Sequence, residues 1–139
     1  LQQKIALAIL MPVVASMGGI AGTQTLIIVT RGIATGRVTS ANIKTLINKE
    51  VAVSGLNGII WSVVIGLITY YWFSDLLLSL VIALAIITNL LVAAFSGAFL
   101  PLALTKLKID PALAGGVILT TITDVIGFVA FLGLAALFI

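Results

Sequence analysis

The stretch that decides the fold is PALAGGVILTTITDVIGFVAFLGLAALFI, which occupies residues 111–139. Asp124, near its centre, is its single charged side chain, and every other residue is apolar, small or hydroxyl-bearing. A helix of about 20 apolar residues is long enough to cross the hydrocarbon core of a bilayer. The stretch is therefore predicted to be a membrane-spanning helix with one carboxylate at mid-membrane depth.

The composition of the whole chain indicates the same class of protein. Of its 139 residues, 62% are hydrophobic and 8% are charged, whereas about a quarter of the residues in a soluble domain are charged. Four apolar segments are long enough to span a membrane, at 5–30, 51–73, 76–104 and 111–139. The sequence predicts an all-α, polytopic membrane protein whose single transmembrane domain covers 1–139.

The charges between the spans predict the orientation in the membrane. The basic residues of the connections are Arg31, Arg37, Lys44, Lys49, Lys106 and Lys108. They lie in 31–50 and 105–110, whereas the tight connection at 74–75 has no lysine or arginine. By the positive-inside rule, 31–50 and 105–110 are cytoplasmic. We also expect a short interfacial helix in the first connection, capped by Thr39 or Ser40.

Several function classes are disfavoured by the residues that are missing. The chain has no cysteine and no histidine, so thiolate sites and the commonest base and transition-metal ligand are excluded. No nucleophile and base can be paired in the spans, and an enzyme is not expected. The net charge of +3 is spread along the chain, which disfavours nucleic-acid binding. Oxygen ligands alone suit hard cations such as Mg²⁺, Ca²⁺ and Mn²⁺.

Asp124 is the strongest candidate site residue, because an ionisable group inside a membrane is costly and usually functional. Helical spacing places Gly116, Thr120, Asp124 and Gly127 on one face, and Thr121 also neighbours Asp124. We predict Asp124, Thr120 and Thr121 as metal ligands. The alternative is that Asp124 only forms a hydrogen bond with a polar side chain of a neighbouring span.

Small and polar residues in the other spans are candidates to line an aqueous path. The pore-lining candidates are Gly18, Gly19, Gly22, Thr23, Gln24, Asn89 and Gly116. Gly18 and Gly22 equally fit the pattern that lets two helices pack closely, and Asn89 equally fits an interhelical hydrogen bond.

Three sets of motifs resemble those of the MgtE magnesium channels and their eukaryotic solute-carrier relatives. The motifs are PVVASMGG at 12–19 with Gly22, Gln24 and RGIATG at 31–36; Pro101-Leu102 with the turn Asp110-Pro111-Ala112; and TDVIG at 123–127. They occur in the family's order and together cover nearly the whole chain.

The resemblance implies a homodimer with five helices per subunit and a cation path along the dimer axis. It also implies that an aspartate of the last helix binds hydrated Mg²⁺, and the motif carries that role to Asp124. The four spans correspond to the last four family helices, so we expect a first helix to precede them. Ile20 and Gly116 depart from the family pattern, in which asparagines are common at these positions, so two oxygen ligands are lost.

The function predicted from the sequence is a divalent-cation channel or transporter of the cell membrane, with Asp124 as the central ligand. Mg²⁺ is the expected ion, and Mn²⁺ or Ca²⁺ are possible. The expected partners are a second copy of the chain, the lipid bilayer and the cation, without nucleic acid. Two alternatives are a proton- or cation-coupled secondary transporter and a non-conducting membrane scaffold.

Overall fold

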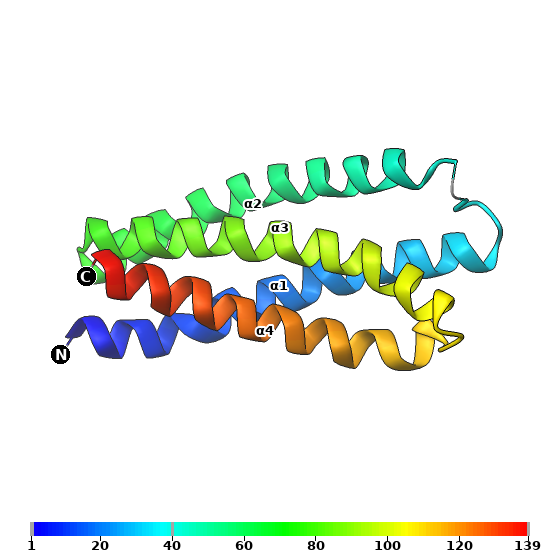
Figure 1. Ribbon diagram of the computed structural model, residues 1–139. Helices are drawn as coiled ribbons and strands as arrows, with labels where there is room; N and C mark the ends of the chain where they lie inside the picture. The colour runs from blue at the N-terminus through cyan, green and yellow to red at the C-terminus, as the bar shows by residue number, and fades with distance from the viewer. Residues whose placement is uncertain (1, 40, 139) are drawn as a thin grey trace.

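The protein is a bundle of four helices that run alternately up and down (Figure 1). The computed structural model describes residues 2–39 and 41–138. Its elements are α1 (Gln2–Ala34), α2 (Ile43–Phe73), α3 (Leu76–Lys106) and α4 (Pro111–Phe138). All four are long and apolar enough to cross a membrane. The all-α, multi-pass fold predicted from the sequence is confirmed.

The start of α2 differs from the expectation. α2 begins at Ile43, directly after Asn42, and continues without a break to Phe73. Residues 43–54 contain no glycine or proline, so nothing in this stretch interrupts helical hydrogen bonding. The separate interfacial helix expected here is therefore wrong, because its residues form the first turns of α2. Ser40, one of its two proposed caps, lies outside the described residues.

The other two connections follow local signals in the sequence. Asp75 caps α3 by accepting a hydrogen bond of 3.1 Å from the Leu78 backbone N–H. α3 ends in a Schellman motif, in which Lys108 takes a left-handed conformation with φ of 63°. The Ile109 N–H then donates to the Leu104 carbonyl at 2.9 Å. These short caps set neighbouring helices antiparallel.

The α3 helix is the centre of the bundle. It packs against each of the other three helices, whereas α1 and α2 barely touch. Half of the apolar window of α3 is buried inside the chain, against 17% for α2. α1 also packs along α4, so these two helices form one side of the bundle and α2 forms the other. The remaining surface is rich in exposed aliphatic and aromatic side chains, as lipid or a partner requires.

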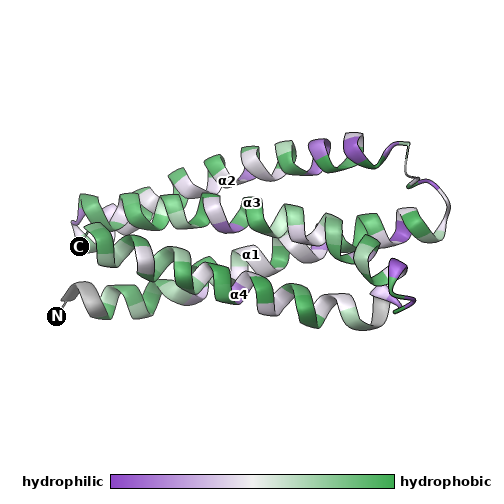
Figure 2. Cartoon of the chain, in the orientation of Figure 1, coloured by the Kyte–Doolittle hydropathy of each residue, from purple (hydrophilic) through white to green (hydrophobic). Residues whose placement is uncertain are grey.

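Hydrophilic residues concentrate at one end of the bundle (Figure 2). That end carries both the α1–α2 and the α3–α4 connections, while the α2–α3 connection lies at the opposite end (Figure 1). The two lysine- and arginine-bearing connections therefore share one side of the membrane. This arrangement agrees with the alternation that the loop charges predict.

Glycines let the helices approach at their crossing points. A Cβ at Gly97 of α3 would lie 2.7 Å from the backbone oxygen of Gly22 in α1. A Cβ at Gly18 would overlap the side-chain amide of Asn89 in α3. Because dispersion and interhelical hydrogen bonds hold helices together in lipid, such close approach is what stabilises the bundle.

Candidate functional site

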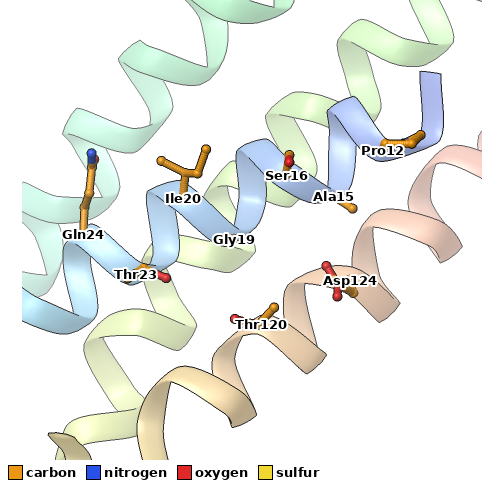
Figure 3. Close-up of a pocket in the computed structure, with 9 residues that line it drawn as sticks. All are labelled: Pro12, Ala15, Ser16, Gly19, Ile20, Thr23, Gln24, Thr120 and Asp124. Atoms are coloured by element: carbon orange, nitrogen blue, oxygen red, sulfur yellow. The ribbon is translucent and has the colours of Figure 1, made fainter. Parts of the chain in front are cut away.

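The Asp124 carboxylate lies near the middle of α4 on the side that faces α1 (Figure 3). Its side chain is half-buried. It makes no hydrogen bond or ion pair with any residue that the structure describes. The alternative expectation, a hydrogen bond to a polar side chain of a neighbouring span, is therefore not seen among these residues. An acidic group at this depth without a protein partner needs water, a cation or a second chain.

A cavity of about 610 Å³ lies between α1 and α4 at Asp124. It is largely open rather than enclosed. The lining residues are Pro12, Ala15, Ser16, Gly19, Ile20, Thr23, Gln24, Thr120 and Asp124. Most of the wall comes from one face of α1, and the acidic and hydroxyl groups opposite it come from α4.

Three of the lining side chains point across the gap between the two helices. Asp124 and Thr120 project from α4 toward α1, and Thr23 projects from α1 toward α4 (Figure 3). The Thr120 hydroxyl donates to the Gly116 carbonyl at 2.8 Å. Since its proton is used inside α4, the Thr120 oxygen presents lone pairs to the cavity, where it can accept from a water or a cation's hydration shell.

Asp124 also lines a second cavity, whose other walls are apolar. This second cavity of about 710 Å³ has Asp124 as its only charged lining residue, with apolar side chains such as Met11, Phe128 and Leu132 around it. Pro12 and Ala15 line both cavities. Asp124 thus stands at the border between a wall with hydroxyl and amide oxygens and an apolar wall.

The structure brings five of the predicted site residues to the first cavity. They are Asp124, Thr120, Gly19, Thr23 and Gln24. Thr121 is exposed, and its hydroxyl donates to the Val117 carbonyl at 2.8 Å. Neither Thr121 nor Gly116 is among the residues that line a cavity at Asp124, although no atom of another helix crowds Gly116.

Gly18, Gly22 and Asn89 lie on packing surfaces instead. Asn89 is fully buried, and its Nδ2 donates to the Val14 carbonyl of α1 at 2.9 Å. A Cβ at Gly22 would lie 3.0 Å from the nearest atom of Leu119. For these three residues the structure places close helix contact where the sequence suggested pore lining. Successive helical residues point about 100° apart, so Gly18 and Gly19 face different neighbours.

Four cavity residues were missed by the sequence reasoning as site residues, namely Pro12, Ala15, Ser16 and Ile20. A helical signal for them exists, because Pro12, Ser16, Gly19 and Thr23 recur at spacings of four, three and four. Ile20 is an exposed apolar side chain at the cavity.

The donor set suits a hydrated hard cation. The cavity offers carboxylate, hydroxyl and amide oxygens and no basic side chain. Within residues 2–39 and 41–138, no group of three or more Asp, Glu, His or Cys side chains is placed to hold a metal ion. Mg²⁺ keeps several of its waters and uses one or two carboxylates, so one acid per chain is compatible with Mg²⁺ held largely through water.

Comparison with known proteins adds the family. The model of the MgtE divalent cation transporter family matches residues 11–134, which include α1 from Met11 onward, all of α2 and α3, and the Asp124 segment of α4. The chain belongs to the MgtE family.

Individual MgtE proteins match along nearly the whole chain. The magnesium transporter MgtE of Bacillus subtilis (strain 168) is 37% identical over 139 residues, which are 100% of this chain and 31% of that protein. The magnesium transporter MgtE of Thermus thermophilus is 31% identical over 138 residues, covering 99% of this chain and 30% of that protein. The chain thus spans about a third of the length of these curated relatives.

Proposed function

We propose that this chain forms the ion pathway of a magnesium transporter, in which Asp124 binds partly hydrated Mg²⁺ between two copies of the chain. The observation that carries the proposal is Asp124 itself, an acid at the edge of an oxygen-lined cavity that has no hydrogen-bond or ion-pair partner among residues 2–39 and 41–138. The family supports it, because the related MgtE proteins are named magnesium transporters. The lysine- and arginine-bearing connections are assigned to the cytoplasm.

A second copy of the chain would supply a second carboxylate to the cation site. The cavity is largely open rather than enclosed, and one copy contributes a single carboxylate to it. Two copies related by a two-fold axis at this face would bring two Asp124 carboxylates together, and their combined charge of −2 matches that of Mg²⁺. The cation then neutralises the charge on binding, while the Thr120 and Thr23 oxygens hold its water shell.

Cation flux into liposomes tests the proposal. We expect the purified protein to take up Mg²⁺ and Asp124→Ala to lose nearly all of this uptake. Thr88→Ala is the control, because the Thr88 hydroxyl is exposed and donates only within α3, to the Leu84 carbonyl at 2.9 Å. Parallel measurements with Mn²⁺ and Ca²⁺ determine selectivity. Equal Mg²⁺ uptake by wild type and Asp124→Ala would overturn the proposal.

The same assay separates the alternative functions. A proton- or cation-coupled transporter requires a counter-gradient and saturates at slow turnover, whereas a channel gives unitary currents in a planar bilayer. A non-conducting scaffold gives no uptake at all, and Asp124→Asn leaves its behaviour unchanged.

A further inference from the structure

A third cavity lies at the hydrophilic end of the bundle, away from Asp124. It measures about 640 Å³ and lies between the end of α1 and the start of α2, where the connection joins them. Arg31, Arg37 and Lys49 line it together with the hydroxyl-bearing Thr35 and Thr45. These residues come from the last turn of α1, the connection and the first two turns of α2.

All the charged side chains that line this cavity are positive. Three basic side chains line it, and no aspartate or glutamate does. None of the three forms an ion pair with a residue in the described part of the chain. The neighbouring acid in the sequence, Glu50, instead accepts a hydrogen bond of 3.4 Å from the Thr25 hydroxyl of α1. Concentrated positive charge in a concave site attracts an anion.

The backbone adds to this field. The Asn42 side chain does not cap α2. Its Oδ1 accepts from the Thr39 N–H at 2.8 Å, and its Nδ2 donates to the Arg37 carbonyl at 2.6 Å. Asn42 therefore stiffens the connection. The first turn of α2, with the positive end of its helix dipole, borders the cavity, a setting that favours phosphate. The end of α1 also borders the cavity, but its Arg31 and Gly32 carbonyls accept hydrogen bonds of 3.0 Å from the Thr35 and Val38 N–H groups, which reduces their opposing effect.

The rule that sets orientation in the membrane does not explain why three basic side chains line one cavity. The positive-inside rule needs basic residues in the connections but does not need them around a cavity. Lys44 and Lys108 meet that rule without lining the site. Guanidinium groups also suit phosphate better than a lysine does, because they donate two parallel hydrogen bonds.

From this geometry we propose that the cavity binds the phosphate of an anionic phospholipid headgroup. Its wall also contains Ile28, Val38 and Leu46, which suits a ligand with a charged end and an apolar body. α1 and α2 barely touch, so a gap separates them, and Ile28 of the cavity wall exposes 49% of its surface. The headgroup lies among the basic residues, and an acyl chain follows this apolar gap. Basic pockets between transmembrane helices bind anionic headgroups in this way.

Native mass spectrometry of the intact chain from nanodiscs tests the site. The nanodiscs contain equal parts phosphatidylglycerol and phosphatidylcholine. We expect wild type to retain phosphatidylglycerol selectively and Arg37→Gln/Lys49→Gln to lose about 30-fold in this selectivity, since each basic residue near an anionic lipid contributes a factor of about five. The control is Lys44→Gln/Lys108→Gln, which removes the same charge outside the cavity and retains selectivity. Arg31→Gln is a second variant that leaves the connection and α2 untouched, and it loses about fivefold.

Three results would overturn the proposal. The first is an equal loss in the control pair, which would assign the effect to general surface charge. The second is an absence of phosphatidylglycerol preference in wild type. The third is displacement of the lipid by millimolar inorganic phosphate, accompanied by binding of phosphate alone, which would assign the site to a soluble anion.

Discussion

Asn89 and Asp124 are both polar residues in the middle of apolar helices, but they differ in burial and in hydrogen bonding. Asn89 is fully buried in α3 and donates to the Val14 carbonyl at 2.9 Å. Asp124 is half-buried in α4, without a hydrogen bond to any described residue, at an open cavity. A polar group that holds two helices together is a structural element. One that is left without a partner beside a cavity is available for a ligand.

The packing around the two residues differs in the same way. Glycines surround Asn89, and a Cβ at Gly18 would overlap its amide while one at Gly127 would lie 3.1 Å from its Nδ2. Around Asp124, the small residues Ala15 and Gly19 leave an open volume. Small residues therefore allow close helix packing on the face of α1 that contains Gly18, and they leave room for a cavity on the face that contains Ala15 and Gly19.

The largest effect on stability is expected at Gly18. Gly18→Ala forces the Asn89 amide away from Val14, and we expect a loss of about 2 kcal/mol in unfolding free energy, because overpacking of a tight site is destabilising. Thermal unfolding followed by tryptophan fluorescence measures it. Gly55→Ala is the control with the same gain in helix propensity, and its Cβ would make an ordinary contact of 3.7 Å with Leu91. Equal melting temperatures for the two variants would contradict this account.

A smaller loss is expected at Asn89 itself. Asn89→Ala removes the hydrogen bond to the Val14 carbonyl and leaves a small void, at a cost of about 1 kcal/mol. The loss is moderate because the Oδ1 of Asn89 has no hydrogen-bond partner among the described residues, so its burial cost disappears as well. An unchanged unfolding free energy in Asn89→Ala would show that the Asn89 hydrogen bond does not hold α1 and α3 together. Thr88→Ala, on the adjacent exposed position, serves as the reference.

The smallest effect is expected at Asp124. Asp124→Asn removes no protein contact that the structure describes, so the unfolding free energy in the absence of divalent cations should change by no more than about 0.5 kcal/mol. With millimolar Mg²⁺ present, wild type should gain stability by ligand binding and Asp124→Asn should not. A large loss without Mg²⁺ would make Asp124 structural and remove the contrast with Asn89.

The four helices and two of their connections were predictable because their signals are local. Apolar length encodes the spans, and Asp75 and Asp110-Pro111 mark helix starts within a few residues. The start of α2 was not predictable from hydropathy, since Ile43 to Glu50 is polar enough to resemble a loop. A helix can extend beyond the membrane, and hydropathy reports only the part inside.

The candidate site was predictable at its centre and not at its edges. Asp124 stands out because a carboxylate in lipid is costly wherever it points. The cavity face of α1 carries only a weak signal. Pro12, Ser16, Gly19 and Thr23 recur at helical spacing, but small residues also occupy the neighbouring positions 15, 18, 21 and 22. Whether Gly18 or Gly19 faces the cavity depends on how α3 and α4 dock, and that is a property of the whole bundle.

The central claim is that the Asp124 cavity is an aqueous path for a cation. The chain has no cysteine, so Thr120→Cys and Ile59→Cys each introduce a single thiol. Thr120 lines the cavity. Ile59 is 56% exposed on α2, and its neighbour Gly58 packs beside Leu90, which places it near the depth of Asn89. The rate of reaction with a water-soluble, positively charged methanethiosulfonate reagent is the measurement.

The account predicts that Thr120→Cys reacts readily in proteoliposomes, that Mg²⁺ slows the reaction, and that this protection disappears when Asp124→Asn is added. Ile59→Cys, which faces lipid, should remain unreactive with or without Mg²⁺. If Thr120→Cys is as unreactive as Ile59→Cys, or if Mg²⁺ protects it equally with and without the Asp124 carboxylate, the central claim is contradicted.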